Sequence, residues 1–146
     1  MTPNIKPLVA GNWKMNVQLS SMTELGGIAS GVSDGLSDKI DALICTPSTL
    51  LTTAAHVVVG THLLIGAQDC HANISGAHTG DISAEMLSNA GSKAVIVGHS
   101  ERRTDHNETN EIVRSKAEAG LRAGLLTIIC IGETESQRKS GETLDI

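Results

Sequence analysis

The sequence of 146 residues has almost no aromatic side chains: Phe and Tyr are absent, and Trp13 is the single Trp. Its apolar content comes instead from Ala, Val, Ile and Leu, together with 15 Gly. A composition rich in β-branched residues and glycine favours a layered α/β fold over a β-sandwich. The length is that of one domain with a substantial core.

Positive charge is also scarce, with 11 Lys and Arg against 16 Asp and Glu. No basic cluster is present, which argues against a nucleic-acid or membrane-surface binder. The sequence shows no signal segment and no apolar run long enough to cross a bilayer. Its three cysteines, Cys45, Cys70 and Cys130, have no CxxC spacing and are typical of buried, reduced thiols. We therefore expect a cytoplasmic protein.

Apolar runs alternate with helical patterns along the chain. The runs predict strands at residues 7–10, 41–45, 62–67, 94–98 and 126–131. The helical patterns predict helices over 23–32, from a Ser48 or Thr49 cap to 55, from an Asp81 or Ser83 cap to 89, over 109–123, and the start of a fifth at 135–139. In the helix at 109–123, Ile112, Ala119 and Ala123 fall near one face. This alternation predicts right-handed βαβ crossovers and a parallel sheet, but does not distinguish an open sheet from a barrel.

Polar side chains follow two of the predicted strands. His99 comes directly after residues 94–98 and precedes a helix-compatible run, whose N-terminal N–H groups favour a neutral imidazole near pH 7. Asn12 and Lys14 follow the first strand. Position alone fits equally well with a surface histidine, a turn-forming asparagine and a solvated lysine.

Several common site motifs are missing. Neither GxGxxG nor GxxxxGK[ST] occurs, so nothing indicates a nucleotide site. Residues 98–102 (GHSER) carry Arg102 where a hydrolase nucleophile elbow has glycine, which argues against Ser100 as a nucleophile. His71 and His78 share one long loop, but no metal-ligand pattern surrounds them. We expect no metal site.

Four segments resemble signatures of the triosephosphate isomerase family. They are residues 10–16 (AGNWKMN), 75–83 (SGAHTGDIS), 97–103 (VGHSERR) and 130–134 (CIGET), and they occur in the family's order. The resemblance implies an α/β fold of the parallel (β/α)8 TIM-barrel family. It covers about the first five βα units, so residues 1–146 would be a single partial TIM-barrel domain that stops before strands six to eight.

The resemblance also implies an activity, the interconversion of dihydroxyacetone phosphate and D-glyceraldehyde 3-phosphate through an enediolate, without a cofactor. His99 would be the electrophile that polarises the substrate carbonyl; a neutral histidine in this role is a known feature of this enzyme. Lys14 would supply positive charge to the phosphate and the oxyanion, and Asn12 a hydrogen bond to the substrate. Glu101 and Ser100 would lie behind them, with Glu101 either a charge partner of Lys14 or simply a helix N-terminal carboxylate.

The resemblance further implies a homodimer formed through the loop at residues 68–80. Thr79 would reach toward Asn12 and Lys14 of the partner subunit, with His78 and Gly76 in the same interface. The length of this loop itself suggests a functional or interface role.

The family's catalytic glutamate, its lid and most of its phosphate site follow the fifth strand and have no counterpart in these residues. We therefore expect the 146 residues alone to be inactive or nearly so, and to need a C-terminal barrel half from the same or a separate chain. Five strands of a barrel leave two unpaired edges, so self-association is also expected. The alternative is a non-catalytic half-barrel that acts as an association or complementation module.

Overall fold

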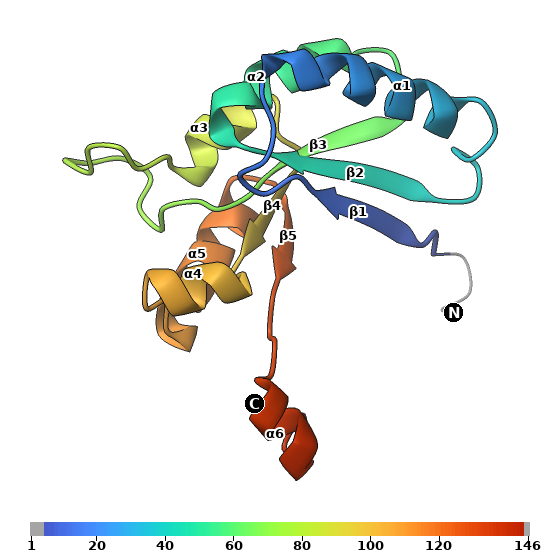
Figure 1. Cartoon of the computed structure of the whole chain (residues 1–146). Helices are drawn as coiled ribbons and strands as arrows, with labels where there is room; N and C mark the ends of the chain where they lie inside the picture. The colour runs from blue at the N-terminus through green and yellow to red at the C-terminus, as the bar shows by residue number, and fades with distance from the viewer. Residues whose placement is uncertain (1–4, 145–146) are drawn as a thin grey trace.

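Five parallel strands form one sheet in the computed structural model, which describes residues 5–144 (Figure 1). The strands are β1 (Leu8–Asn12), β2 (Asp41–Thr46), β3 (Leu63–Ala67), β4 (Ala94–Val97) and β5 (Leu126–Ile129). Each pairs with the next in chain order, and every pairing is parallel. Parallel neighbours require crossover connections, and helices supply them here. The predicted α/β class with a parallel sheet is confirmed.

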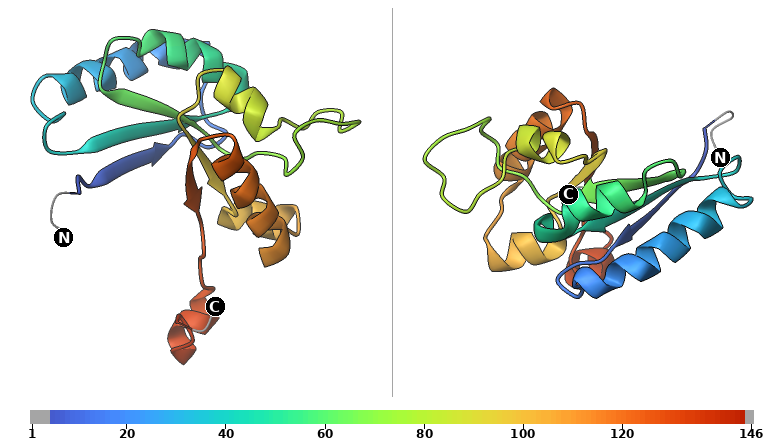
Figure 2. Two further views of the ribbon diagram at one scale, coloured as in Figure 1. Left: turned by 180° about the vertical axis from the view of Figure 1, so that it is seen from behind. Right: turned by 90° about the horizontal axis from the view of Figure 1, so that it is seen from above.

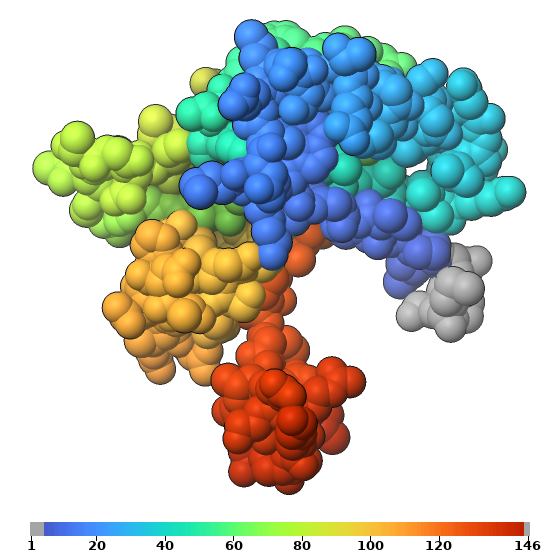
Figure 3. All heavy atoms as spheres, in the orientation of Figure 1, coloured from blue at the N-terminus to red at the C-terminus, as the bar shows by residue number. Residues whose placement is uncertain are grey.

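The helices lie mainly along the outer face of the sheet (Figure 2). They are α1 (Met22–Ser33), α2 (Ser48–Val57), α3 (Ala84–Asn89), α4 (Ser100–Asp105), α5 (Asn110–Arg122) and α6 (Glu135–Ser140), with a short 3-10 turn, η1 (Leu19–Ser21), before α1. Figure 3 shows α6 standing apart from the body, with open space between β1 and the C-terminal segment. None of the helices in residues 5–144 has the length and apolar character needed to cross a membrane.

Helix α4 is a separate element that the sequence indicated only as a helix-compatible run. It does not fuse with α5 because Asn107 takes a left-handed conformation, with φ of 54°, between them. The predicted cap of α2 is wrong: Pro47 occupies the N-cap, and Ser48 and Thr49 lie inside the helix. Ser83 does cap α3, where its side chain accepts a hydrogen bond from the Met86 N–H at 3.2 Å.

The main core lies between the helices and the outer face of the sheet. Its largest fully buried side chains on that face include Leu25, Leu51, Ile65, Leu87, Val95 and Val97. Burying one such side chain stabilises the fold by about 1.5–3 kcal/mol. A smaller cluster of Leu43, Cys45, Ala94 and Ile96 lies on the inner face.

Of the residues predicted to share one face of α5, Ala119 is buried, whereas Ile112 is 41% exposed. Val113 and Ala117 are also buried. The helix turns its small residues to the sheet because this allows a closer approach. A Cβ on Gly120 would lie only 2.5 Å from Thr127 Oγ1.

Both edges of the sheet carry exposed apolar side chains. Within the described residues, β1 pairs only with β2 and β5 only with β4. Val9 is 55% exposed and Ile129 50%. Unpaired strand edges of this kind are surfaces on which another strand can pair.

Candidate active site

The carboxyl ends of β1 and β4 bring a lysine, a glutamate and a histidine together. Lys14 Nζ lies 2.5 Å from Glu101 Oε1, and the other carboxylate oxygen of Glu101 contacts His99 Nδ1. The strands β1 and β4 are separated by two others, so a flat sheet would hold their backbones roughly 14 Å apart at ~4.8 Å per strand. Curvature of the sheet therefore contributes to the contact.

The backbone at Lys14 is held in an unusual conformation. Its φ is 50°, in the left-handed region that non-glycine residues seldom adopt. Asn12 Oδ1 accepts a hydrogen bond from the Lys14 N–H at 2.9 Å, and Gln68 Nε2 donates to the Lys14 carbonyl at 3.1 Å. Such strain persists where neighbouring groups enforce it, and it concentrates at functional sites.

The side-chain oxygen of Asn12 is already used in the turn at Lys14. Its Oδ1 holds Lys14, which leaves the Nδ2 hydrogens as donors for a ligand. The two interpretations of Asn12 from sequence, a turn former and a hydrogen-bond donor, are therefore compatible.

Gln68 is a site-supporting residue that sequence reasoning missed. Its Nε2 also donates to the Cys45 carbonyl at 3.2 Å, so it links the ends of β1 and β2. It directly follows β3. The rule that polar residues at strand ends gather at one edge of a parallel sheet would have found it.

His99 occupies the N-cap of α4, and its side chain is 24% exposed. Burial, and then the nearby cation of Lys14, lower the pKa of His99 below its ordinary 6.5. The direction agrees with the neutral imidazole expected from sequence, but the causes are burial and Lys14 rather than the helix N-terminus. An imidazole that is neutral at pH 7 still carries one N–H, which can donate a hydrogen bond.

Glu101 lies between Lys14 and His99. Its Oε1 contacts Lys14 Nζ, and its Oε2 lies against His99 Nδ1 and also accepts a hydrogen bond from Ser100 Oγ at 2.9 Å. The carboxylate thus holds the lysine and the histidine side by side.

The cysteines near this edge are not nucleophiles. Burial raises the pKa of Cys45 to about 12, with the neighbouring Cys130 adding to it, and burial also raises the pKa of Cys130. Because the thiolate is the reactive form, both remain inert thiols near pH 7.

The loop at residues 68–80 stands out from the body of the molecule between β3 and α3 (Figure 1). Gly76, His78 and Thr79 are all exposed there. Their role in a dimer interface stays a prediction, as do the substrate roles of Asn12, Lys14 and His99.

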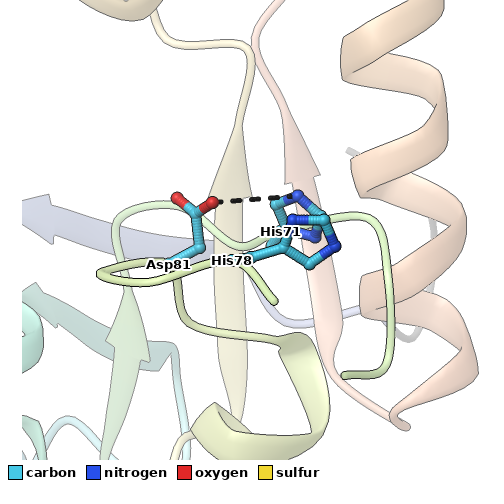
Figure 4. Close-up of side chains that lie close together, drawn as sticks. All are labelled: His71, His78 and Asp81. Atoms are coloured by element: carbon cyan, nitrogen blue, oxygen red, sulfur yellow. Dashed lines mark ion pairs between the residues drawn. The ribbon is translucent and has the colours of Figure 1, made fainter. Parts of the chain in front are cut away.

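The same loop, with Asp81 directly after it, holds a cluster that sequence reasoning missed: ligand atoms of His71, His78 and Asp81 lie within 4.8 Å of one another (Figure 4). The two rings are tilted by 31° with their centroids 4.2 Å apart, and His71 Nε2 lies 3.8 Å from Asp81 Oδ2. Asn73 donates its backbone N–H to His71 Nδ1 at 3.0 Å, and its side-chain nitrogen lies 3.1 Å from His78 Nε2. These bonds use one nitrogen of each ring and organise the loop.

Comparison with known proteins identifies the family. The family model described as triosephosphate isomerase matches residues 7–146. The chain belongs to the triosephosphate isomerase family. The residues at the ends of β1 and β4 lie within the matched range, and the sequence motifs implied the same family.

Close relatives carry the family name throughout. The triosephosphate isomerase of Rhizobium etli is 57% identical over 146 residues, which are all of this chain and 57% of that protein. The Brucella abortus biovar 1 protein is 56% identical and is covered to 58%. The crystal structure of triosephosphate isomerase from Bartonella henselae superposes with a TM-score of 0.91 at 50% identity, over 97% of this chain and 58% of that one. The TIM-barrel fold class is confirmed, and the chain spans 58% of the length of that solved relative.

Proposed function

We propose that this chain provides the electrophilic half of a triosephosphate isomerase active site. The reaction interconverts dihydroxyacetone phosphate and D-glyceraldehyde 3-phosphate through an enediolate, a step of glycolysis and gluconeogenesis. The observation that carries the proposal is the meeting of Lys14 and His99, through Glu101, at the strand ends. Family membership supports the choice of reaction.

Each residue has a role that its chemistry suits. The neutral His99 ring polarises the substrate carbonyl and moves protons between the two substrate oxygens. Lys14 is a compact cation that stabilises the phosphate and the developing oxyanion. Asn12 donates from Nδ2. Glu101 holds the side chains of Lys14 and His99 in place, and Ser100 donates to Glu101.

Proton abstraction from carbon requires a general base, which we assign to a carboxylate outside residues 1–146. Among residues 5–144, the carboxylate that contacts both Lys14 and His99 is Glu101, and it is committed to that ion pair. Removing a general base costs about 10²–10⁴-fold in rate. We infer that the chain alone turns over little and that activity requires a C-terminal barrel half, in the same or a separate polypeptide.

The exposed loop at residues 68–80 suits the dimer contact inferred from the family. In this proposal Thr79 approaches Asn12 and Lys14 of the partner subunit, with His78 and Gly76 beside it. The loop's exposure supports this assignment. The proposed setting is cytoplasmic, and the chemistry requires no cofactor.

The test is complementation. The 146-residue chain is mixed with a polypeptide carrying the remaining part of the Bartonella henselae enzyme, and isomerisation of dihydroxyacetone phosphate is assayed. The parent complex is expected to be active, Lys14→Ala to lose at least ~100-fold, and Lys39→Ala, an exposed lysine away from the site, to match the parent. A complex that forms by native mass spectrometry but does not isomerise the substrate would overturn the proposal.

The second candidate is a non-catalytic association module. The exposed apolar side chains on β1 and β5 favour it, since they suit strand pairing irrespective of chemistry. Intact mass of the purified material distinguishes the two. Oligomers of this chain alone, with no second polypeptide and no turnover after complementation, would support the module.

A further inference from the structure

We propose that Arg103 is a positioning residue that sets the direction of the His99 side chain by holding the peptide groups on both sides of it. This inference rests on the proposed function for its catalytic meaning. The geometric part stands separately and can be tested separately.

Arg103 binds both carbonyl oxygens that flank His99. Its side-chain Nε donates to the Gly98 carbonyl at 2.8 Å. Its backbone N–H donates to the His99 carbonyl at 3.0 Å in the first turn of α4, where the same carbonyl also accepts from the Arg102 N–H at 2.9 Å. Rotation of the first peptide group is the φ of His99 and rotation of the second is its ψ. With both oxygens bound, the two angles are fixed at −56° and 147°, and so is the direction of the Cα–Cβ bond.

The guanidinium that does this is itself anchored on two other elements. Nη1 donates to Asn110 Oδ1 at 2.8 Å, at the start of α5, and Nη2 donates to the Cys130 carbonyl at 2.9 Å, just after β5. Hydrogen bonds from a charged donor are about twice as strong as neutral ones. The position of His99 therefore depends on contacts with α5 and the end of β5 as well as on its own strand.

Gly98 has the backbone conformation, and the absence of a side chain, that the Arg103 contact requires. Its φ is 71°, and a Cβ there would lie 2.6 Å from Val113 Cγ1 and 3.1 Å from Arg103 Nη2. Glycine gives the carbonyl an orientation that other residues resist, and it leaves space for the guanidinium.

The preceding arginine has a different task. Arg102 pairs with Asp69 at 2.9 Å and with the buried Glu108 at 2.6 Å, so it serves a charge network. The side-chain partners of Arg103 among the described residues are carbonyl and amide oxygens. This difference marks Arg103 as a backbone clamp. Small displacements of a catalytic group are costly, since ~1 Å can reduce the rate ~100-fold.

The experiment measures backbone order by ¹⁵N relaxation in the full 146-residue chain. In the parent, the amides of His99 and Ser100, which belong to the two bound peptide groups, are expected to have order parameters of ~0.85. Arg103→Gln removes the bond to the Gly98 carbonyl, so the order parameter of the His99 amide is expected to fall below ~0.6. Arg103→Lys keeps the charge but cannot bind all three side-chain partners at once, so it is expected to lose order at the same amide. Asn110→Ala removes one anchor and leaves both flanking carbonyls bound, so the order is expected to be retained.

Turnover in the complemented assembly provides the functional readout. Arg103→Lys is expected to lower kcat about tenfold, with KM within about twofold, because the clamp acts on the chemical step. Arg114→Gln, an exposed arginine of α5, is the charge control. Unchanged order at the His99 amide in folded Arg103→Lys, or an equal loss in Asn110→Ala, would overturn the clamp. If the parent assembly has no activity while order responds as expected, the proposed function fails and the clamp stands.

Discussion

Lys14 and Glu101 are 87 residues apart in the chain, and their side chains meet with Nζ 2.5 Å from Oε1. The contact spans the end of β1 and the first turn of α4. It joins the residue that would attract a phosphate to the residue that contacts His99. A phosphate dianion approaching Lys14 must therefore compete with Glu101 for the same ammonium group.

This competition predicts that Glu101→Gln binds inorganic phosphate more tightly than the parent, by roughly 3–10-fold, because a like charge has been removed from the site. Titration followed by ³¹P NMR gives the two affinities. Glu118→Gln, which removes an exposed carboxylate from α5, is the matched control and should change little. Equal affinities of Glu101→Gln and the parent would show that Lys14 is not a phosphate ligand.

The lowered pKa of His99 predicts a pH dependence of stability. In the unfolded chain the ring protonates near 6.5, and in the folded chain it does so at a lower pH. As the pH falls through 6.5 toward the folded-state pKa, the unfolded state takes up more protons and stability declines. His99→Gln should flatten this decline in urea unfolding between pH 7 and 5, whereas His106→Gln, on the exposed surface, should keep the parent slope.

The buried ion network predicts a large effect at Lys116. Its side chain is 10% exposed and bonds Asp69 at 2.7 Å and Glu108 at 2.6 Å, with Glu108 only 4% exposed. Lys116→Met leaves two carboxylates without this cation, which should destabilise the fold by about 3–5 kcal/mol. Arg114→Met breaks an exposed pair with Glu118 and should cost under ~1 kcal/mol. Urea unfolding that shows equal losses would contradict the network's importance.

Gly98 and Gly124 form a matched pair for testing the turn before His99. Both have a left-handed φ, 71° and 73°, but a Cβ on Gly98 meets Val113 while one on Gly124 meets nothing within 4 Å. Gly124→Ala should cost about 1–2 kcal/mol from backbone strain alone, and Gly98→Ala clearly more. Val113→Ala should recover part of the Gly98→Ala loss in the double variant. If the two glycine variants lose the same stability, the close packing at Gly98 is not a constraint.

The sequence predicted the strands well because each is a short apolar run that ends at a polar or turn-forming residue. His99 and Lys14 could be singled out for the same reason, since both follow such runs. The buried face of α5 was not predicted. Periodicity placed Ile112 on one face with Ala119, whereas the structure leaves Ile112 half-exposed and buries Val113, Ala117 and Gly120, so that α5 can approach β5.

The supporting role of Arg103 could not be predicted from the sequence. Its guanidinium is anchored on the carbonyl of Cys130, which is 27 residues away, and a hydrogen bond of this range leaves no local pattern. Gln68 is different: it contacts Lys14, 54 residues away, but its place directly after β3 could have marked it. The cluster of His71, His78 and Asp81 was missed for a related reason: its spacing matches no metal motif, and only the fold of the loop brings the rings together.

The most direct test of the central claim is isomerisation of dihydroxyacetone phosphate in D₂O by the complemented assembly, followed by NMR. An enediolate route exchanges the abstracted proton with solvent, so the glyceraldehyde 3-phosphate formed should carry deuterium at carbon 2. His99→Gln should slow its formation at least ~100-fold. A parent assembly that forms stably but leaves the substrate unconverted, or yields product without deuterium, would contradict the account.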